Sequence, residues 1–153
     1  MSRADDRSRD SALADEQPDL ELTLPARAEN VAVVRHAFGG LGDVLDIPDQ
    51  ALSDIKLAVT EACTNVVVHA YPGAQGPMGV RAHIDARHLT VVVTDRGRGI
   101  LPRADSPGLG LGLPLIATLA ESLELGTGQD EQTEVRMTFN LDGVPDGLVG
   151  RGR

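Results

Sequence analysis

Three polar residues, Glu61, Asn65 and His69, recur at every fourth position of a stretch that is otherwise rich in valine and alanine. Residues four apart lie on one face of an α-helix, so the three side chains would form a single stripe. A carboxylate and an amide among apolar neighbours are costly to bury without hydrogen-bond partners. The stripe therefore predicts either a polar cavity or a cap on a neighbouring segment.

Two glycine-rich segments hold the other residues suited to chemistry. Asp95 begins the sequence Asp-Arg-Gly-Arg-Gly directly after an almost continuous β-branched run, and spaced glycines beside a carboxylate let a ligand approach the backbone closely. Residues 108–112 are Gly-Leu-Gly-Leu-Gly before a helical pattern, and backbone N–H groups at a helix start favour an anion such as phosphate. Taken alone, an ordinary turn and tight packing explain the two segments about as well. The Walker pattern is absent, and the glycine spacing does not match the dinucleotide fingerprint.

Hydrophobic periodicity places these segments in a two-layer architecture. It predicts strands at 21–24, 80–86, 89–95, 123–125 and 133–141, and helices at 29–45, 49–71 and 113–123. Glycines near the end of the first helix should weaken it. The order strand, helix, helix, strand, strand, helix, strand, strand predicts an α+β fold, a two-layer sandwich. Its sheet would be mixed or antiparallel, and a mixed sheet is the prediction. The helices would lie on one face of this sheet.

Composition limits the function. The chain has 153 residues, a formal net charge of −9 and a pI near 4.7, which suits one domain and argues against nucleic acid as the main partner. Its single cysteine, Cys63, excludes a disulfide framework and a thiolate metal site, and it fits a small buried residue in a reducing cytoplasm. No apolar run predicts a transmembrane helix or a signal peptide. Residues 1–18 and 143–153 are expected to be a disordered and a flexible tail around one domain at 19–142.

In combination and in this order, the segments closely resemble the GHKL ATPase superfamily, and within it the anti-sigma-factor serine/threonine kinases of bacterial partner-switching systems. Residues 61–71 resemble the family's N box, E-A-x-x-N-x-x-x-H-A-Y. Residues 95–100 look like its D-x-G-x-G box, residues 108–113 are similar to its second glycine box, and residues 133–135 are similar to its final T-x-V strand. The resemblance implies the Bergerat ATP-binding fold.

The resemblance also implies a site for ATP and Mg²⁺. Asn65 would hold Mg²⁺ through its side-chain oxygen, and Glu61 would be the general base for an attacking hydroxyl. Asp95 would accept a hydrogen bond from the adenine amino group. The other ATP-binding residues would be Gly97 and Gly99 beside the base, Thr133 at the adenine, Arg103 at the γ-phosphate, and Gly108, Leu109, Gly110, Leu111 and Gly112 over the phosphates. His69 would be structural, and a solvent-exposed lid residue is the alternative for Arg103.

The implied function is a cytoplasmic, homodimeric anti-sigma kinase. It would bind a sigma factor and phosphorylate a STAS-type anti-anti-sigma protein on serine or threonine, without direct contact to nucleic acid or membrane. Residues 100–107 form a shorter lid than in many relatives. A nucleotide-responsive binding module without kinase activity therefore stays open as a second hypothesis, and a stand-alone ATPase as a third. A histidine-kinase catalytic domain is disfavoured, because no phosphoacceptor helix hairpin precedes Leu20.

Overall fold

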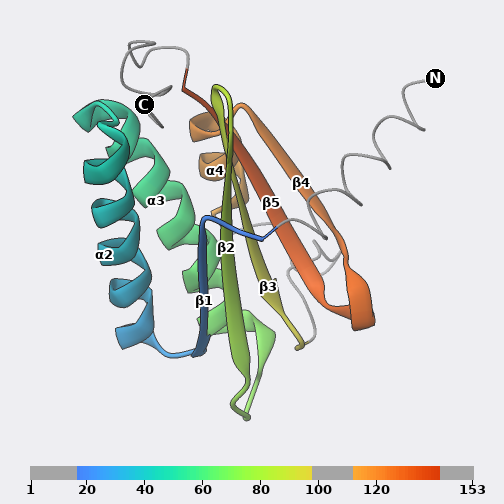
Figure 1. Ribbon diagram of the computed structural model, residues 1–153. Helices are drawn as coiled ribbons and strands as arrows, with labels where there is room; N and C mark the ends of the chain where they lie inside the picture. Colours follow the sequence, from blue (N-terminus) through green and yellow to red (C-terminus); the bar gives the residue numbers. More distant parts are fainter. Residues whose placement is uncertain (1–16, 98–111, 142–153) are drawn as a thin grey trace, which may run out of the picture.

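The computed structural model describes residues 17–97 and 112–141, which form one sheet with helices packed on one of its faces (Figure 1). The five strands lie in the order β1-β2-β3-β5-β4. Their bounds are Leu20–Pro25 for β1, Pro77–Asp85 for β2, His88–Asp95 for β3, Ser122–Thr127 for β4 and Thr133–Asn140 for β5. The helices are α2 (Ala28–Leu45), α3 (Asp49–Asn65) and α4 (Leu113–Leu119), with a π-helical turn η1 (Val66–Ala70) and a 3-10 turn η2 (Gln129–Glu131). Apart from Gln17 and Pro18, the two tails lie outside the described residues.

The predicted two-layer α+β architecture is confirmed, but the sheet is not mixed. Every pairing among the described strands is antiparallel. The turn at Ala86 and Arg87 joins β2 to β3, and a short connection through η2 joins β4 to β5, so both pairs are hairpins. Hairpin partners must run antiparallel. The strands β1 and β2 are joined through the helix pair α2 and α3, which also returns the chain in the opposite direction (Figure 1).

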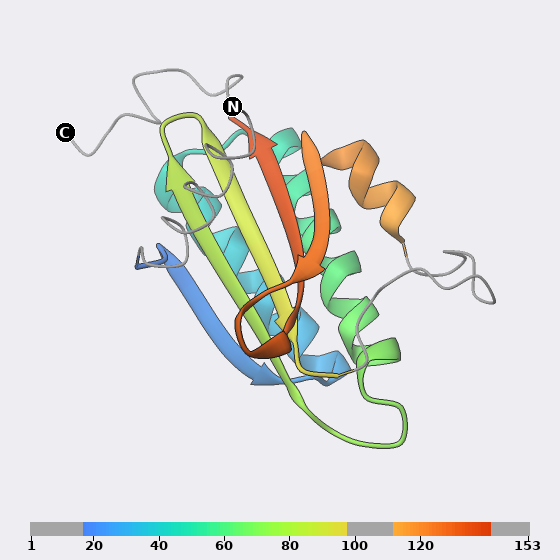
Figure 2. The same cartoon turned by 90° about the vertical axis from the view of Figure 1, so that its right-hand side faces the viewer.

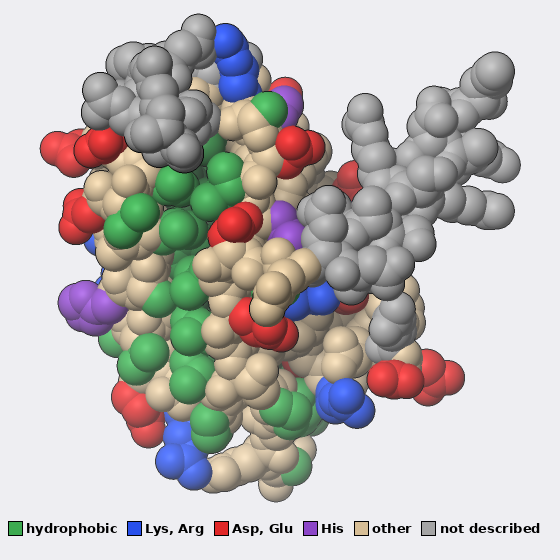
Figure 3. Space-filling view, viewed as in Figure 1, with side chains coloured by type: hydrophobic (Ala, Val, Ile, Leu, Met, Phe, Trp, Pro, Cys, Tyr) green, Lys and Arg blue, Asp and Glu red, His purple; other side chains and the backbone are tan. Residues whose placement is uncertain are grey.

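The core lies between the sheet and the helices, and period-two alternation selects the strand residues that enter it. On β3, Leu89, Val91 and Val93 are almost fully buried in this core. Partly buried leucines of β1 pack at its margin, and Figure 3 shows the resulting column of apolar side chains where α2 meets the β1 edge. The core is built from small aliphatic residues, as the composition requires with two Phe, one Tyr and no Trp.

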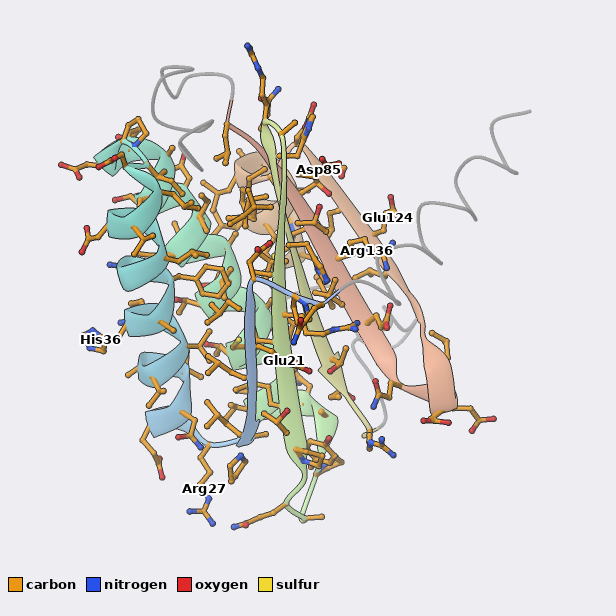
Figure 4. The ribbon with its side chains drawn as sticks, in the orientation of Figure 1. Glu21, Arg27, His36, Asp85, Glu124 and Arg136 are labelled. Atoms are coloured by element: carbon orange, nitrogen blue, oxygen red, sulfur yellow. The ribbon has the colours of Figure 1, made fainter. Side chains whose placement is uncertain are left out.

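The other face of the sheet is polar. The pairing register places Glu21 beside Arg81, Arg81 beside Val92, Val92 beside Arg136, and Arg136 beside Glu124, so opposite charges are neighbours at both ends of this row. Neighbouring opposite charges on adjacent strands stabilise a sheet. Figure 4 shows Arg136 and Glu124 projecting away from the helix layer.

Helix α2 ends at Leu45, as predicted, and the ends of the other two helices differ from the sequence-based prediction. Helix α2 runs through its three glycines, and Gly42 lets α3 approach closely: a Cβ on Gly42 would lie 2.6 Å from the Leu52 side chain. Helix α3 ends at Asn65 and continues as the π-helical turn η1, whereas regular helix was expected to residue 71. Helix α4 was expected to reach residue 123; it ends at Leu119, because Ala120 is extended and β4 begins at Ser122. No helix in the described ranges is long and apolar enough to cross a membrane.

Candidate ATP site

The candidate site lies where α3 and η1 meet the end of β3 (Figure 2). Six of its predicted residues are described: Glu61, Asn65, Asp95, Gly97, Gly112 and Thr133. The other six, Gly99, Arg103, Gly108, Leu109, Gly110 and Leu111, lie outside the described residues.

Glu61 and Asn65 occupy successive turns of α3. Asn65 is the last residue of the helix and is 2% exposed, and Glu61 is half-buried. The π-helical turn follows Asn65 directly and contains His69. Single π-helical turns occur often at functional sites, because the wider turn changes the direction of the side chains that follow it. The stripe of three polar residues therefore does not continue as a regular helical face to His69.

Asp95 is the last residue of β3 and is 2% exposed. Its Oδ1 accepts a hydrogen bond of 2.9 Å from the backbone N–H of Gly97, and no described residue donates to its Oδ2. Burial raises the pKa of this carboxyl above its usual 3.8, and the Gly97 N–H lowers it in part. The turn therefore fixes the carboxylate and leaves one oxygen able to accept from a ligand.

Thr133 reaches the same place from the neighbouring strand. It is the first residue of β5, and its Cα pairs directly with that of Asp95 across the sheet. Directly opposed side chains on antiparallel strands lie within about 5.5 Å of each other at Cβ. A ligand held by the free oxygen of Asp95 would thus meet a hydroxyl at this edge of the site.

Close glycine contacts bring the separate segments together. A Cβ on Gly97 would overlap the carbonyl oxygen of Ala70, so the turn after β3 packs against the end of η1. Gly112 has a φ of 67°, and a Cβ there would lie 2.5 Å from Oε2 of Glu61. The start of α4 therefore packs directly against the Glu61 carboxylate. The structure brings together the five site residues Glu61, Asn65, Asp95, Gly97 and Gly112 through these contacts, and Thr133 through strand pairing.

Two further contacts hold the turn after Asp95, and neither was expected from the sequence. The backbone N–H of Arg96 donates to the Tyr71 hydroxyl at 2.8 Å. The Gln132 amide, in the orientation that satisfies both its polar atoms, accepts from Arg96 Nε at 3.2 Å and from Nη2 at 3.1 Å. Tyr71 could have been found as the last residue of the N-box pattern, whereas Gln132 lies in a loop and carries no comparable signal.

The donor set suits a Mg²⁺ ion that is bound mainly through nucleotide phosphates and water. Among the described residues, no group of three or more His, Cys, Asp or Glu side chains could hold a metal ion. A protein site for Mg²⁺ with ATP requires only one or two oxygen ligands from the chain. The Asn65 amide provides one such oxygen, one helical turn from the Glu61 carboxylate.

Comparisons with known proteins identify the family of this chain. The family described as "Histidine kinase-like ATPase domain" matches residues 24–139, from β1 to β5. Serine-protein kinase RsbW of Halalkalibacterium halodurans is 38% identical over 125 residues, covering 71% of this chain and 76% of that protein. The protein of the same name in Bacillus thuringiensis is 32% identical over 134 residues, covering 78% and 82% of the two chains. A third, in Bacillus cereus, is 31% identical over the same length. The chain therefore belongs to the histidine kinase-like ATPase domain family.

Proposed function

We propose that this chain is an ATP-dependent protein serine/threonine kinase that acts as an anti-sigma factor. The observation that carries the proposal is the meeting of three motif segments. Gly97 packs on Ala70 at the end of the N-box segment, and Gly112 packs on Glu61 at its start. One site would thereby contain the general base Glu61, the metal-binding amide oxygen of Asn65 and the buried Asp95 carboxylate that accepts from the adenine amino group. The relatives named serine-protein kinase support phosphoryl transfer to a protein as the reaction.

The nucleotide would be recognised at the end of β3. Asp95 Oδ2 would accept from the adenine amino group, while Gly97 would leave room for the base and Thr133 would contact it. Asn65 would hold Mg²⁺ through its amide oxygen. The phosphate contacts assigned to Gly99, Arg103 and residues 108–111 rest on the motif resemblance. Bound ATP with Mg²⁺ would supply the phosphoryl group and neutralise the charge that develops during its transfer.

Glu61 would act as the general base. As a serine or threonine hydroxyl of the substrate attacks the γ-phosphorus, the new O–P bond forms, the bond to the β-phosphate oxygen breaks and ADP leaves. The Glu61 carboxylate accepts the hydroxyl proton. Gly112 lies against Oε2 of Glu61, which restricts this carboxylate on one side.

The proposed substrate is a STAS-type anti-anti-sigma protein, and the proposed regulatory partner is a sigma factor. The unphosphorylated STAS protein would compete with the sigma factor for this chain, and phosphorylation would release it. We further propose a homodimer that works in the cytoplasm. The partners and the dimer rest on the family resemblance, and the relatives' name supports the kinase activity alone.

The test measures ATP binding and phosphoryl transfer in separate steps. Calorimetry with Mg²⁺ and ATP gives binding, and γ-labelled ATP with a STAS-type candidate gives transfer. We expect Glu61→Gln to bind ATP within about twofold of wild type and to reduce transfer at least about a hundredfold. Glu21→Gln is the matched control, because Glu21 is exposed on β1 and lies on the polar face of the sheet.

The outcomes separate the proposed kinase from its alternatives. Phosphoryl transfer by Glu61→Gln at the wild-type rate would show that Glu61 is not the general base. Tight ATP binding and sigma capture without transfer to any STAS-type protein would instead identify a nucleotide-responsive binding module. Steady release of phosphate in the absence of a protein substrate would identify a stand-alone ATPase.

A further inference from the structure

Tyr71, the only tyrosine of the chain, has no role in the proposed function. Its hydroxyl makes two hydrogen bonds to segments far apart in the sequence. It donates to the backbone carbonyl of Pro77 at 2.5 Å and accepts from the backbone N–H of Arg96 at 2.8 Å. Pro77 is the first residue of β2, and Arg96 directly follows Asp95. One phenol oxygen therefore joins the end of the N-box segment to the start of β2 and to the adenine turn.

The ring of Tyr71 is fixed by its surroundings. A Cβ on Gly76 would overlap the ring, so the loop that leads to β2 packs directly on it. Burial raises the pKa of the hydroxyl, the Arg96 N–H lowers it, and the charge of Asp95 raises it. Because the pKa lies above the ordinary value of 10.0, well above neutral pH, the phenol keeps its proton there. It can then donate to Pro77 while it accepts from Arg96.

The Arg96 contact acts on the group that would read the base. The Asp95–Gly97 turn is closed by the hydrogen bond from Gly97 N–H to Asp95 Oδ1. Arg96, the middle residue of this turn, is bonded to Tyr71, and Gly97 packs on the carbonyl of Ala70, the residue before Tyr71. The turn is thus attached to the end of η1 at two neighbouring points. A shift of the hydroxyl would move the carboxylate.

The same contacts tie the two halves of the candidate site. The N-box segment carries Asn65 at the end of α3, and only η1 separates Asn65 from Tyr71. The distance between the metal-binding amide and the adenine turn therefore depends on η1 and on the Tyr71 hydroxyl. The wider π-helical turn directs Tyr71 towards β2 and Arg96 instead of along the helical stripe.

We propose that Tyr71 is a positioning residue for adenine recognition: its hydroxyl holds the Asp95–Gly97 turn so that Asp95 Oδ2 faces the adenine amino group. The proposal rests on the proposed function, because it assumes that Asp95 reads adenine. It adds a residue that sets nucleotide specificity without touching the nucleotide. Tyr71→Phe tests it, since phenylalanine keeps the ring that packs on Gly76 and loses both hydrogen bonds.

The readout is the preference for ATP over inosine triphosphate. Inosine carries an oxygen in place of the adenine amino group, so the group at that position accepts and cannot donate to Asp95. Wild type should bind ATP more tightly than inosine triphosphate. In Tyr71→Phe, ATP affinity should fall about fivefold and inosine triphosphate affinity less than about twofold, because misplacing one acceptor affects only the nucleotide that donates to it. The ratio stays informative if the variant is partly unfolded, since both nucleotides report on the same folded molecules.

Thr118→Val is the matched control. It also removes one hydroxyl, which donates to the Pro114 carbonyl at 2.9 Å on the exposed side of α4, and its ATP preference should equal that of wild type. An unchanged ATP preference in Tyr71→Phe, or an equal loss for both nucleotides, overturns the positioning role and leaves the proposed function intact. Wild type that binds neither nucleotide removes the proposed function itself, and the role of Tyr71 with it.

Discussion

Asp95 shows at the scale of one residue how function and stability oppose each other. Its carboxyl is 2% exposed, and burial raises its pKa, so the charged form is disfavoured in the folded protein. A group whose pKa is higher in the folded than in the unfolded state contributes most to stability at low pH. That contribution falls as the pH rises from 3.8, the ordinary value, through the raised folded-state value. At neutral pH the buried carboxylate therefore lowers the stability of the nucleotide-free protein.

Asp95→Asn should accordingly stabilise the nucleotide-free protein at neutral pH while weakening ATP binding at least about tenfold. The amide oxygen can still accept from Gly97, but an NH₂ group then takes the place of Oδ2 and meets the adenine amino donor. Urea unfolding from about pH 4 to about pH 8 should show the stability difference growing with pH. A difference that shrinks as the pH rises would contradict the sign of this argument.

Gly97 is the second residue of the adenine turn for which a close contact restricts the side chain. Gly97→Ala should destabilise the protein by about 1–3 kcal/mol, because the new Cβ overlaps the Ala70 carbonyl and the backbone must shift. ATP binding should be lost with the position of the turn. Gly40→Ala is the matched control: no atom lies within 4 Å of a Cβ there, and the residue is helical. It should raise stability by about 0.5–1 kcal/mol. Equal urea midpoints for the two variants would contradict the contact.

At the scale of elements, hydrophobic periodicity in the sequence predicted the strands and helices. Every predicted strand and helix is present, because alternation and helical spacing follow directly from which face of each element is buried. The π-helical turn was not predictable in this way. Val66, Val67 and Val68 fit a regular helix equally well by type, and the departure follows from the packing of Ala70 and Tyr71 on the turn after β3. Tertiary contacts selected the local geometry there.

The same limit applies to the candidate site. Residue types and spacing singled out Glu61 and Asn65 as polar residues four apart in a mainly apolar helical run, and Asp95 as a carboxylate at a strand end before spaced glycines. The partners of the adenine turn, Tyr71 and Gln132, act through contacts between distant segments. Such contacts have no period within the sequence and become visible only when the strands are paired.

Cys63 makes the stability of α3 measurable. It is the only cysteine, it is fully buried in this helix, and burial raises its pKa from 9.0 to about 12. Alkylation requires the thiolate and access to it, so labelling of the native protein near pH 8 should be at least about a hundredfold slower than in urea. If ATP binds against α3, saturating nucleotide should slow the labelling of Cys63 further. Val44→Cys in a Cys63→Ala background is the control, because Val44 is 79% exposed and should label rapidly. Fast native labelling of Cys63 would show that α3 opens readily.

At the scale of the whole molecule, the two faces of the sheet differ in the groups that they carry. The helix-side face carries the apolar core and ends in Asp95, so the candidate site is an extension of the core at one end of the strands. The opposite face carries the charged row and an ion-pair cluster, in which Glu134 lies 3.7 Å from Arg81 and 3.9 Å from Arg136. Both arginines therefore have a carboxylate partner within this face.

His83 is the exception on the polar face. It is 4% exposed, and neither ring nitrogen has a hydrogen-bond partner among the described residues. A buried polar group without a partner costs about 1–3 kcal/mol relative to an apolar group of the same shape. Because His83 lies on the face opposite the candidate site, with Thr90 as its neighbour on β3, this cost has no connection to nucleotide recognition.

His83→Leu should therefore raise the free energy of unfolding by about 1 kcal/mol, since it removes the unpaired nitrogens and nearly keeps the volume. ATP affinity and transfer should stay at wild-type values, which separates the two faces of the sheet functionally. His36→Leu is the matched control: His36 is exposed on α2 and projects from the helix layer (Figure 4), so its replacement should leave stability within about 0.5 kcal/mol. Thermal and urea unfolding measure both variants. A lower stability for His83→Leu would mean that His83 makes a favourable contact, and a changed ATP affinity would mean that the two faces are coupled.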